Sequence, residues 1–148
     1  MSKKKVNIFG TTGSIGQSTL EVLRGYKGKY DFIAFSAHDN VDQLIKDCLE
    51  FKPQYANIGH EKHFFKLKKA LYDTGIVLSY GRDALLDLAS TKVDWSMSAI
   101  VGFSGVEVSL LCAEHSKILA LANKEALVCA GTLLLSICKI YNTKLIPV

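Results

Sequence analysis

Lys124 is the residue whose position most clearly indicates chemistry. It stands between Asn123 and Glu125, after an apolar run and at the start of a helical pattern over residues 124–141. A positive charge in the first turn of a helix opposes the helix dipole and costs about 0.5 kcal/mol, whereas an acid there is favourably placed. Such a lysine is expected to hold an anionic ligand. The alternatives are that Lys124 pairs with Glu125 or points into water, and the residues alone leave them open.

Three glycines near the N-terminus form a second candidate site. Gly10, Gly13 and Gly16 follow an apolar run at residues 6–9, and an amphipathic pattern begins at Ser14. Their Gly-x-x-Gly-x-x-Gly spacing is looser than the Gly-x-Gly-x-x-Gly of many dinucleotide sites. Glycines in such a turn adopt conformations that a Cβ forbids and let a pyrophosphate approach the N–H groups of the following helix. A nucleotide site and a plain turn between a strand and a helix both fit this pattern.

The turn after the second expected strand is where a dinucleotide site selects its cofactor. An acidic residue about 20 residues past the glycines binds the ribose hydroxyls of NAD, and a basic residue favours the 2′-phosphate of NADP. The turn consists of Ala37, His38, Asp39 and Asn40. Asp39 favours NAD, whereas His38 is able to contact a phosphate. The residues therefore leave the choice of cofactor open.

Histidines and cysteines raise the question of metal binding. His60 and His63 form a His-x-x-His pair with no carboxylate at a useful spacing, so we expect a solvated loop and the start of a helix there. The four cysteines occur singly, in patterns that look helical and buried: Cys48, Cys112, Cys129 and Cys138. We expect reduced thiols in the core rather than metal or redox sites.

Apolar periodicity predicts strands and helices that alternate along the chain. Strands are expected near residues 6–9, 31–37, 55–58, 76–79, 93–101, 118–122 and 144–148, with helices between them. Asn40 and Gln43 form a capping box ahead of a helical stripe that Pro53 ends: Val41, Leu44, Ile45, Cys48 and Leu49. The order predicts one α/β domain over residues 1–148, with a mostly parallel sheet of about seven strands and helices on both faces. Ligands of such a sheet bind beyond the carboxyl ends of its strands, at residues 10–16, 37–40, 79–82, 102–105 and 123–125.

Composition excludes several classes of protein. The 148 residues are 49% hydrophobic and carry a net charge of +4, much of it from the lysines at 3–5, which we interpret as a solvated tail. Basic and aromatic residues do not interleave, so no nucleic-acid partner is expected. The most apolar stretch, residues 127–140, is interrupted by polar side chains and too short for a membrane span, which predicts a buried helix. With no secretory signal, a cytoplasmic protein without membrane contact is expected.

Three motifs together resemble one family. They are Gly10-Thr11-Thr12-Gly13-Ser14-Ile15-Gly16, the stretch Met97-Ser98-Ala99-Ile100-Val101-Gly102, and Leu121-Ala122-Asn123-Lys124-Glu125-Ala126-Leu127-Val128. The chain is similar over essentially its whole length to the N-terminal, NADPH-binding domain of the 1-deoxy-D-xylulose 5-phosphate reductoisomerase family. The resemblance implies a Rossmann-like fold. It also implies rearrangement and reduction of 1-deoxy-D-xylulose 5-phosphate to 2-C-methyl-D-erythritol 4-phosphate, with NADPH and Mg²⁺ or Mn²⁺, in non-mevalonate isoprenoid biosynthesis.

The resemblance also implies roles for individual residues. Lys124 would contact the substrate. Cofactor contacts are implied for the glycine turn (Gly10, Thr11, Thr12, Gly13, Ser14, Ile15 and Gly16), for the turn after the second strand (Ala37, His38, Asp39 and Asn40), and for Ala99, Ile100, Asn123 and Glu125. Thr11 replaces the family's usual serine, and His38-Asp39 replaces a loop that carries Gly-Lys in some relatives. The NADPH preference therefore follows less directly than the fold.

The last residues depart from the family pattern. In the family an Ile-Pro-Val motif continues into Asp-Ser-Glu-His, whose acids bind the metal, whereas this sequence stops at Val148. We therefore expect an excised cofactor domain that binds dinucleotide but lacks the metal ligands, the catalytic lid and the C-terminal helical region. The full-length enzyme is expected to be a homodimer acting on a phosphorylated small molecule. The alternatives are the cofactor domain of another NAD(P)-dependent dehydrogenase, such as a homoserine or semialdehyde dehydrogenase, and a non-catalytic nucleotide-sensing module.

Overall fold

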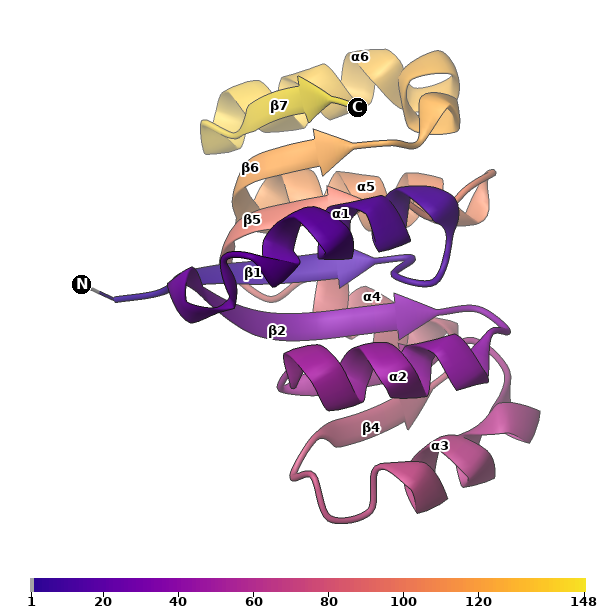
Figure 1. Ribbon diagram of the computed structural model, residues 1–148. Coiled ribbons are helices and arrows are strands. Elements are labelled where there is room, and N and C mark those ends of the chain that lie inside the picture. The colour runs from indigo at the N-terminus through magenta and orange to yellow at the C-terminus, as the bar shows by residue number, and fades with distance from the viewer. Residues whose placement is uncertain (1) are drawn as a thin grey trace.

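Seven parallel strands form one sheet in the computed structural model, which describes residues 2–148 (Figure 1). The sheet has the order β4-β3-β2-β1-β5-β6-β7, and every neighbouring pair is parallel. The order reverses at β1 and β5, so the chain leaves these two adjacent strands toward opposite sides and opens a crevice between them. The predicted Rossmann-like α/β fold is confirmed. The strands are β1 (Lys4–Phe9), β2 (Tyr30–Ala37), β3 (Tyr55–Ile58), β4 (Val77–Tyr80), β5 (Val93–Ser98), β6 (Ser116–Leu121) and β7 (Lys144–Pro147).

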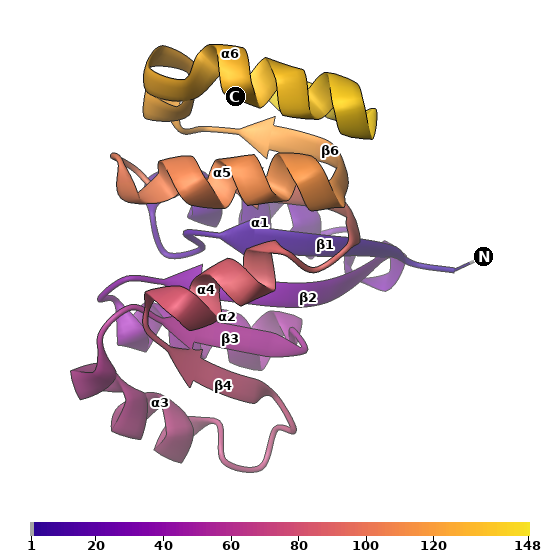
Figure 2. The same ribbon diagram turned by 180° about the vertical axis from the view of Figure 1, so that it is seen from behind.

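Helices cover both faces of the sheet, because consecutive parallel strands need crossover connections. Helices α1, α2 and α3 pack on the face that Figure 1 shows in front, and α4, α5 and α6 pack on the face seen in Figure 2. Each layer buries its own apolar cluster, the first around Ile8, Leu44 and Phe35 and the second around Phe9, Val108 and Leu119. The helices are α1 (Ser14–Arg24), α2 (Val41–Phe51), α3 (Phe64–Ala70), α4 (Arg82–Ala89), α5 (Ser104–His115) and α6 (Lys124–Tyr141), with short 3₁₀ turns at η1 (Lys27–Lys29) and η2 (Glu61–His63).

Helix α2 forms for the reason its sequence indicates, with two corrections. The side chain of Asn40 caps it by accepting a hydrogen bond from the backbone N–H of Gln43 at 3.2 Å. The Gln43 side chain does not return to Asn40, however, and donates to the buried carboxylate of Asp47 instead. Leu49, predicted to lie in the buried stripe, is 50% exposed, and Phe51 takes its place in the core. The helix ends at Phe51, just before Pro53.

Helix α6 has the predicted bounds but not the predicted burial. It buries Ala126, Leu134 and Cys138, while Val128 is 82% exposed and Ile140 is 74% exposed. The expectation of a buried helix was therefore wrong. Apolar residues lie on all sides of this helix, so its sequence has no polar face that would identify the side exposed to solvent. Cys129 is likewise exposed, whereas the other three cysteines are buried. No helix in residues 2–148 has the length and apolar character that crossing a bilayer requires.

Candidate functional site

A cavity of about 450 Å³ lies at the switch point of the sheet, beyond the carboxyl ends of its strands. Four of the five turns predicted to hold ligands contribute to its wall. The walls therefore bring together parts of the chain that are far apart in the sequence. The lining residues are Gly10, Thr12, Gly13, Ser36, Ala37, His38, Asn57, Gly59, Gly81, Arg82, Leu85, Ala99, Ile100, Val101 and Ser104.

The glycine turn is held tightly between two neighbouring segments. The backbone N–H groups of Gly10 and Thr11 both donate to the carbonyl oxygen of Ser36, at 3.2 and 2.9 Å. Gly10 has a φ of +86°, and a Cβ on it would lie 2.7 Å from the carbonyl oxygen of Ala99. Only glycine fits this position, because both the dihedral angle and the close approach exclude a side chain. Thr11 is fully buried beneath the turn, so its side chain does not line the cavity.

The N-terminus of α1 carries no side-chain cap and no acidic residue in its first turn. Gly13 is its N-cap residue, in extended conformation, and lines the cavity. Ser14 and Ile15 are exposed, whereas Gly16 is buried so closely against the carbonyl oxygens of Gly10 and Thr11 that a Cβ would collide with them. Unpaired N–H groups and the positive end of the helix dipole make such a terminus a site for an anion.

A partly buried polar network joins the turn to α2, and no local pattern in the sequence predicts it. Gln17 donates to the carbonyl oxygen of Thr11 at 2.8 Å and to the carboxylate of Asp47 at 3.0 Å. Gln43 donates to the other oxygen of Asp47 at 2.9 Å. Burial raises the pKa of Asp47, while the two amide donors lower it. The network couples the position of the glycine turn to the position of α2.

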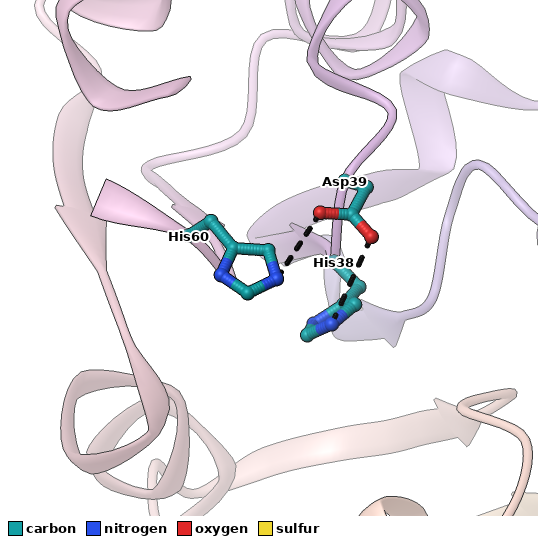
Figure 3. Close-up of side chains that lie close together, drawn as sticks. All are labelled: His38, Asp39 and His60. Carbon is teal, nitrogen blue, oxygen red and sulfur yellow. Dashed lines mark ion pairs between the residues drawn. The ribbon is translucent and has the colours of Figure 1, made fainter. Parts of the chain in front are cut away.

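Three imidazoles surround the carboxylate of Asp39 at the ends of β2 and β3. Figure 3 shows two of them, those of His38 and His60. The Nε2 atom of His60 lies 3.3 Å from Oδ1 of Asp39, and those of His38 and His63 each lie 3.8 Å from one of its oxygens. The sequence has no carboxylate at a useful spacing from the histidine pair. The fold supplies one from a distant segment, because pairing of β2 with β3 brings the loop that carries Asp39 against residues 60–63. Of these residues, His38 lines the cavity.

Asn123 joins the start of α6 to the loop after β5. Its side-chain Nδ2 donates to the carbonyl oxygens of Ile100 and Gly102, at 2.5 and 2.9 Å, and its Oδ1 accepts from the backbone N–H of Ala126 at 2.8 Å. The side chain is buried and has both donor hydrogens occupied by the protein. Ala99 and Ile100 line the cavity, so Asn123 shapes the wall from behind. The predicted contact of Asn123 with a cofactor stays a prediction.

Lys124 and Glu125 lie in the first turn of α6, outside the lining of the cavity. Lys124 is exposed and Glu125 is half-buried. Within the described part of the chain no ion pair joins the two side chains, which leaves the ammonium group available to an anion. Their predicted roles, substrate contact for Lys124 and cofactor contact for Glu125, stay predictions.

Several residues that line the cavity were not predicted, because the sequence of a strand does not show which strands lie beside it. Asn57 is buried in β3 and donates to the Ser79 hydroxyl at 3.0 Å and to the Gly81 carbonyl at 3.2 Å, which fixes the turn after β4. Arg82 follows that turn and reaches across to α5, where it pairs with Glu107 at 3.2 Å. The rule that ligands bind at strand ends predicted the turn at 79–82, whereas Asn57 and Gly59 follow only from the sheet order.

Strand order, the glycine turn and a cavity at the switch point define the chain as a Rossmann-like α/β domain. A family model described as 1-deoxy-D-xylulose 5-phosphate reductoisomerase matches residues 6–131. The chain belongs to this family. The resemblance drawn from the glycine turn and from residues 121–128 is thereby confirmed.

Relatives and solved structures agree with this assignment. The chain is 42% identical over 148 residues to the 1-deoxy-D-xylulose 5-phosphate reductoisomerase of Ruegeria sp. (strain TM1040), covering all of this chain and 38% of that protein. It superposes with a TM-score of 0.95 and 35% identity on the Zymomonas mobilis reductoisomerase in complex with NADPH, covering 99% of this chain and 38% of that one. A reductoisomerase bound to NADPH, fosmidomycin and magnesium gives a TM-score of 0.89 at 33% identity, with 97% of this chain and 36% of that chain covered. The chain thus spans less than two fifths of the relatives it matches.

Proposed function

We propose that residues 1–148 form the NADPH-binding domain of a 1-deoxy-D-xylulose 5-phosphate reductoisomerase. The proposal rests on the N-terminus of α1, which has no side-chain cap and faces the cavity at the switch point. The glycine turn in front of it has no room for a Cβ at Gly10 or Gly16. A volume of about 450 Å³ is in the usual range for ligand sites. The NADPH complexes of similar structures support the choice of ligand.

Each part of a dinucleotide has a matching region in the cavity. The pyrophosphate fits the N–H groups at Gly13 and the first turn of α1, where the dipole favours negative charge. The adenosine half fits the side of His38, at the end of β2, where dinucleotide sites hold the ribose. The nicotinamide half then lies toward Ala99 and Ile100, whose loop is braced by Asn123. Bound NADPH supplies the hydride, and this domain fixes where it is presented.

Lys124 is proposed to contact the substrate of the complete enzyme. It is exposed at the same edge of the sheet as the cavity. Its positively charged ammonium group would attract the negative charge of a phosphorylated small molecule. Replacing Lys124 with alanine in the complete enzyme is expected to lower kcat far more than it weakens NADPH binding. An unchanged kcat would show that Lys124 is only a solvated side chain.

The described residues do not fit the divalent metal that the family uses. The one group of three possible ligand side chains in residues 2–148 is His38, Asp39 and His60, with a single carboxylate and two imidazoles. Mg²⁺ and Mn²⁺ prefer oxygen ligands. We therefore assign no metal step to this chain, and the rearrangement and reduction of 1-deoxy-D-xylulose 5-phosphate is proposed for the complete enzyme only.

The remaining expectations also concern the whole protein. A homodimer is consistent with the exposed apolar side chains of α6, among them Val128 and Ile140, and stays a prediction. Bacterial relatives and four unpaired cysteines support a cytoplasmic location.

Gly13 offers a test that separates binding from folding. Its φ is −77° and a Cβ would find only the Gly10 carbonyl oxygen at 3.8 Å, so side chains are tolerated. Gly13→Asp is expected to stabilise α1 slightly by supplying an N-cap acceptor, and to abolish NADPH binding because its carboxylate repels the pyrophosphate. Gly13→Asn is the matched control, with the same shape and no charge.

Isothermal titration calorimetry and thermal unfolding of both variants provide the measurement. The proposal predicts that Gly13→Asp unfolds at a temperature equal to or above that of the wild type yet loses at least tenfold in NADPH affinity, while Gly13→Asn loses much less. Equal NADPH affinity in wild type and Gly13→Asp would place the pyrophosphate elsewhere and overturn the proposal.

A further inference from the structure

We propose that His38, His60 and His63 recognise the adenosine 2′-phosphate of NADPH, and that Asp39 holds these imidazoles in place instead of selecting NAD. The inference rests on the proposed dinucleotide site and names the part of it that distinguishes NADPH from NADH. The residues alone left this choice open, because an acid at the end of β2 ordinarily favours NAD.

The position of the histidines matches the position of a 2′-phosphate. His38 directly follows β2 and lines the cavity, at the strand end where dinucleotide sites bind the adenosine ribose. His60 follows the neighbouring strand, and its ring centroid lies 4.7 Å from that of His38. Gly59 brings the two strand ends together by donating its N–H to the carbonyl oxygens of Ala37 and His38, at 2.9 and 3.0 Å. A Cβ on Gly59 would collide with His38.

The carboxylate of Asp39 faces three imidazole rings. Their Nε2 atoms lie 3.3 to 3.8 Å from its oxygens, so a ribose that approaches this carboxylate meets the imidazoles as well. A protonated imidazole has two N–H donors, and one directed at Asp39 leaves the other for a phosphate oxygen. With its imidazoles protonated, the cluster would carry a net positive charge, which complements a phosphate dianion.

Near neutral pH, histidine is the one type of side chain in this cluster that changes its charge. The surrounding elements carry Asp42 and Lys46 on α2, Glu61 and Lys62 on η2 and Lys66 on α3, and Arg82 lines the same cavity. Asp42 is paired with Lys66 at 2.6 Å, and Arg82 with Glu107. Carboxylates, lysines and arginines keep their charge between pH 6 and 8.5, whereas histidine is the side chain that loses its charge across this range. A 2′-phosphate is therefore expected to bind more tightly at the lower end of this pH range.

A metal ion is the competing occupant, and the exposure of the cluster favours the phosphate. The donor atoms of His38, Asp39 and His60 lie within 4.8 Å of one another, but they are three ligands where a closed structural zinc site has four. All three side chains are exposed, with half or more of each accessible to solvent. Such open side chains suit a phosphate that arrives with the cofactor.

The test compares NADPH with NADH, because the two differ only in the 2′-phosphate. Dissociation constants of both are measured for the 148-residue chain by calorimetry at pH 6.5 and 8.5, in buffer containing EDTA. A phosphate monoester has a second pKa near 6, so the 2′-phosphate is mostly dianionic at both values. The preference for NADPH over NADH is expected to fall at least fivefold from pH 6.5 to 8.5, while NADH affinity changes little.

Variants identify the groups responsible. His60→Gln is expected to reduce the NADPH preference at pH 6.5 and to flatten its pH dependence, and His115→Gln on α5 is the matched control that leaves both unchanged. A preference that is equal at the two pH values, or that persists in His60→Gln, would overturn the inference. So would a preference that appears only when Zn²⁺ is added. Failure of both NADPH and NADH to bind would instead contradict the proposed function itself.

Discussion

The side-chain amide of Asn123 donates a hydrogen bond to the carbonyl oxygen of Gly102 at 2.9 Å and so ties the start of α6 to the loop after β5. The same side chain caps α6 through the N–H of Ala126. Asn123 thus serves the cavity by holding Ile100 in its wall, from a position that is itself buried.

Replacing Asn123 with alanine is expected to lower the free energy of unfolding by about 2 kcal/mol, because a helix cap is lost and two buried carbonyl oxygens lose their donor. NADPH affinity is expected to fall as well, since the loop at Ala99 and Ile100 is no longer braced. Asn123→Asp retains the cap acceptor and removes the donors, so it separates the two effects. Urea unfolding and calorimetry measure them, and a variant with unchanged stability would show that the bonds contribute nothing.

Gln17 is expected to matter for stability because it serves two buried acceptors. Gln17→Ala removes a donor from Asp47 and from the carbonyl oxygen of Thr11, at an expected cost of about 1–3 kcal/mol. Burial already raises the pKa of Asp47, and the loss of a donor raises this pKa further. The stability difference from wild type should therefore be larger at pH 7, where the carboxyl must ionise in the fold, than at pH 4. A difference independent of pH would contradict this account.

Glu50 makes a contribution to stability that acid removes. The hydrogen bond from the Arg24 side chain, at an N–O distance of 2.5 Å, together with Lys27, lowers the pKa of Glu50 to about 2 from its usual 4.5. A depressed carboxyl pKa stabilises the fold above the unfolded value and loses that contribution as pH falls through the folded value. Glu50→Gln is thus expected to be less stable than wild type at pH 7 and equally stable near pH 2. Urea midpoints at both pH values check this. An equal loss of stability in Glu50→Gln at both pH values would contradict the predicted pH dependence.

Cys129 is expected to be the thiol that reacts in the native protein. It is exposed on α6, whereas burial raises the pKa of both Cys48 and Cys112 to about 12 and leaves them as inert core thiols. Titration with a thiol reagent should label one cysteine rapidly in the folded chain and four after denaturation. Cys129→Ser should remove the rapid phase, and its persistence would mean that another thiol opens readily.

The sheet and the four predicted turns that line the cavity were predictable because each rests on local signals. Apolar runs and glycines marked β1 and the turn at Gly10, and Asn40 marked the start of α2. Lys124 stands where its sequence placed it, in the first turn of α6, but does not line the cavity.

The rest depends on pairings between distant segments, which no local pattern records. Asp39 meets His60 only because β2 lies beside β3, and Gln17 meets Asp47 only because α1 packs near α2. The exposure of Val128 depends on what packs against α6, and an apolar helix does not show in its sequence which side is covered.

Binding of NADPH at the glycine turn of this chain is tested most directly by amide chemical shifts. Titration of the ¹⁵N-labelled chain with NADPH is expected to give saturable shifts at residues 10–16, 37–40 and 99–101, and little change along residues 128–141. No saturable shift at millimolar NADPH, or shifts confined to residues 128–148, would contradict the proposed site.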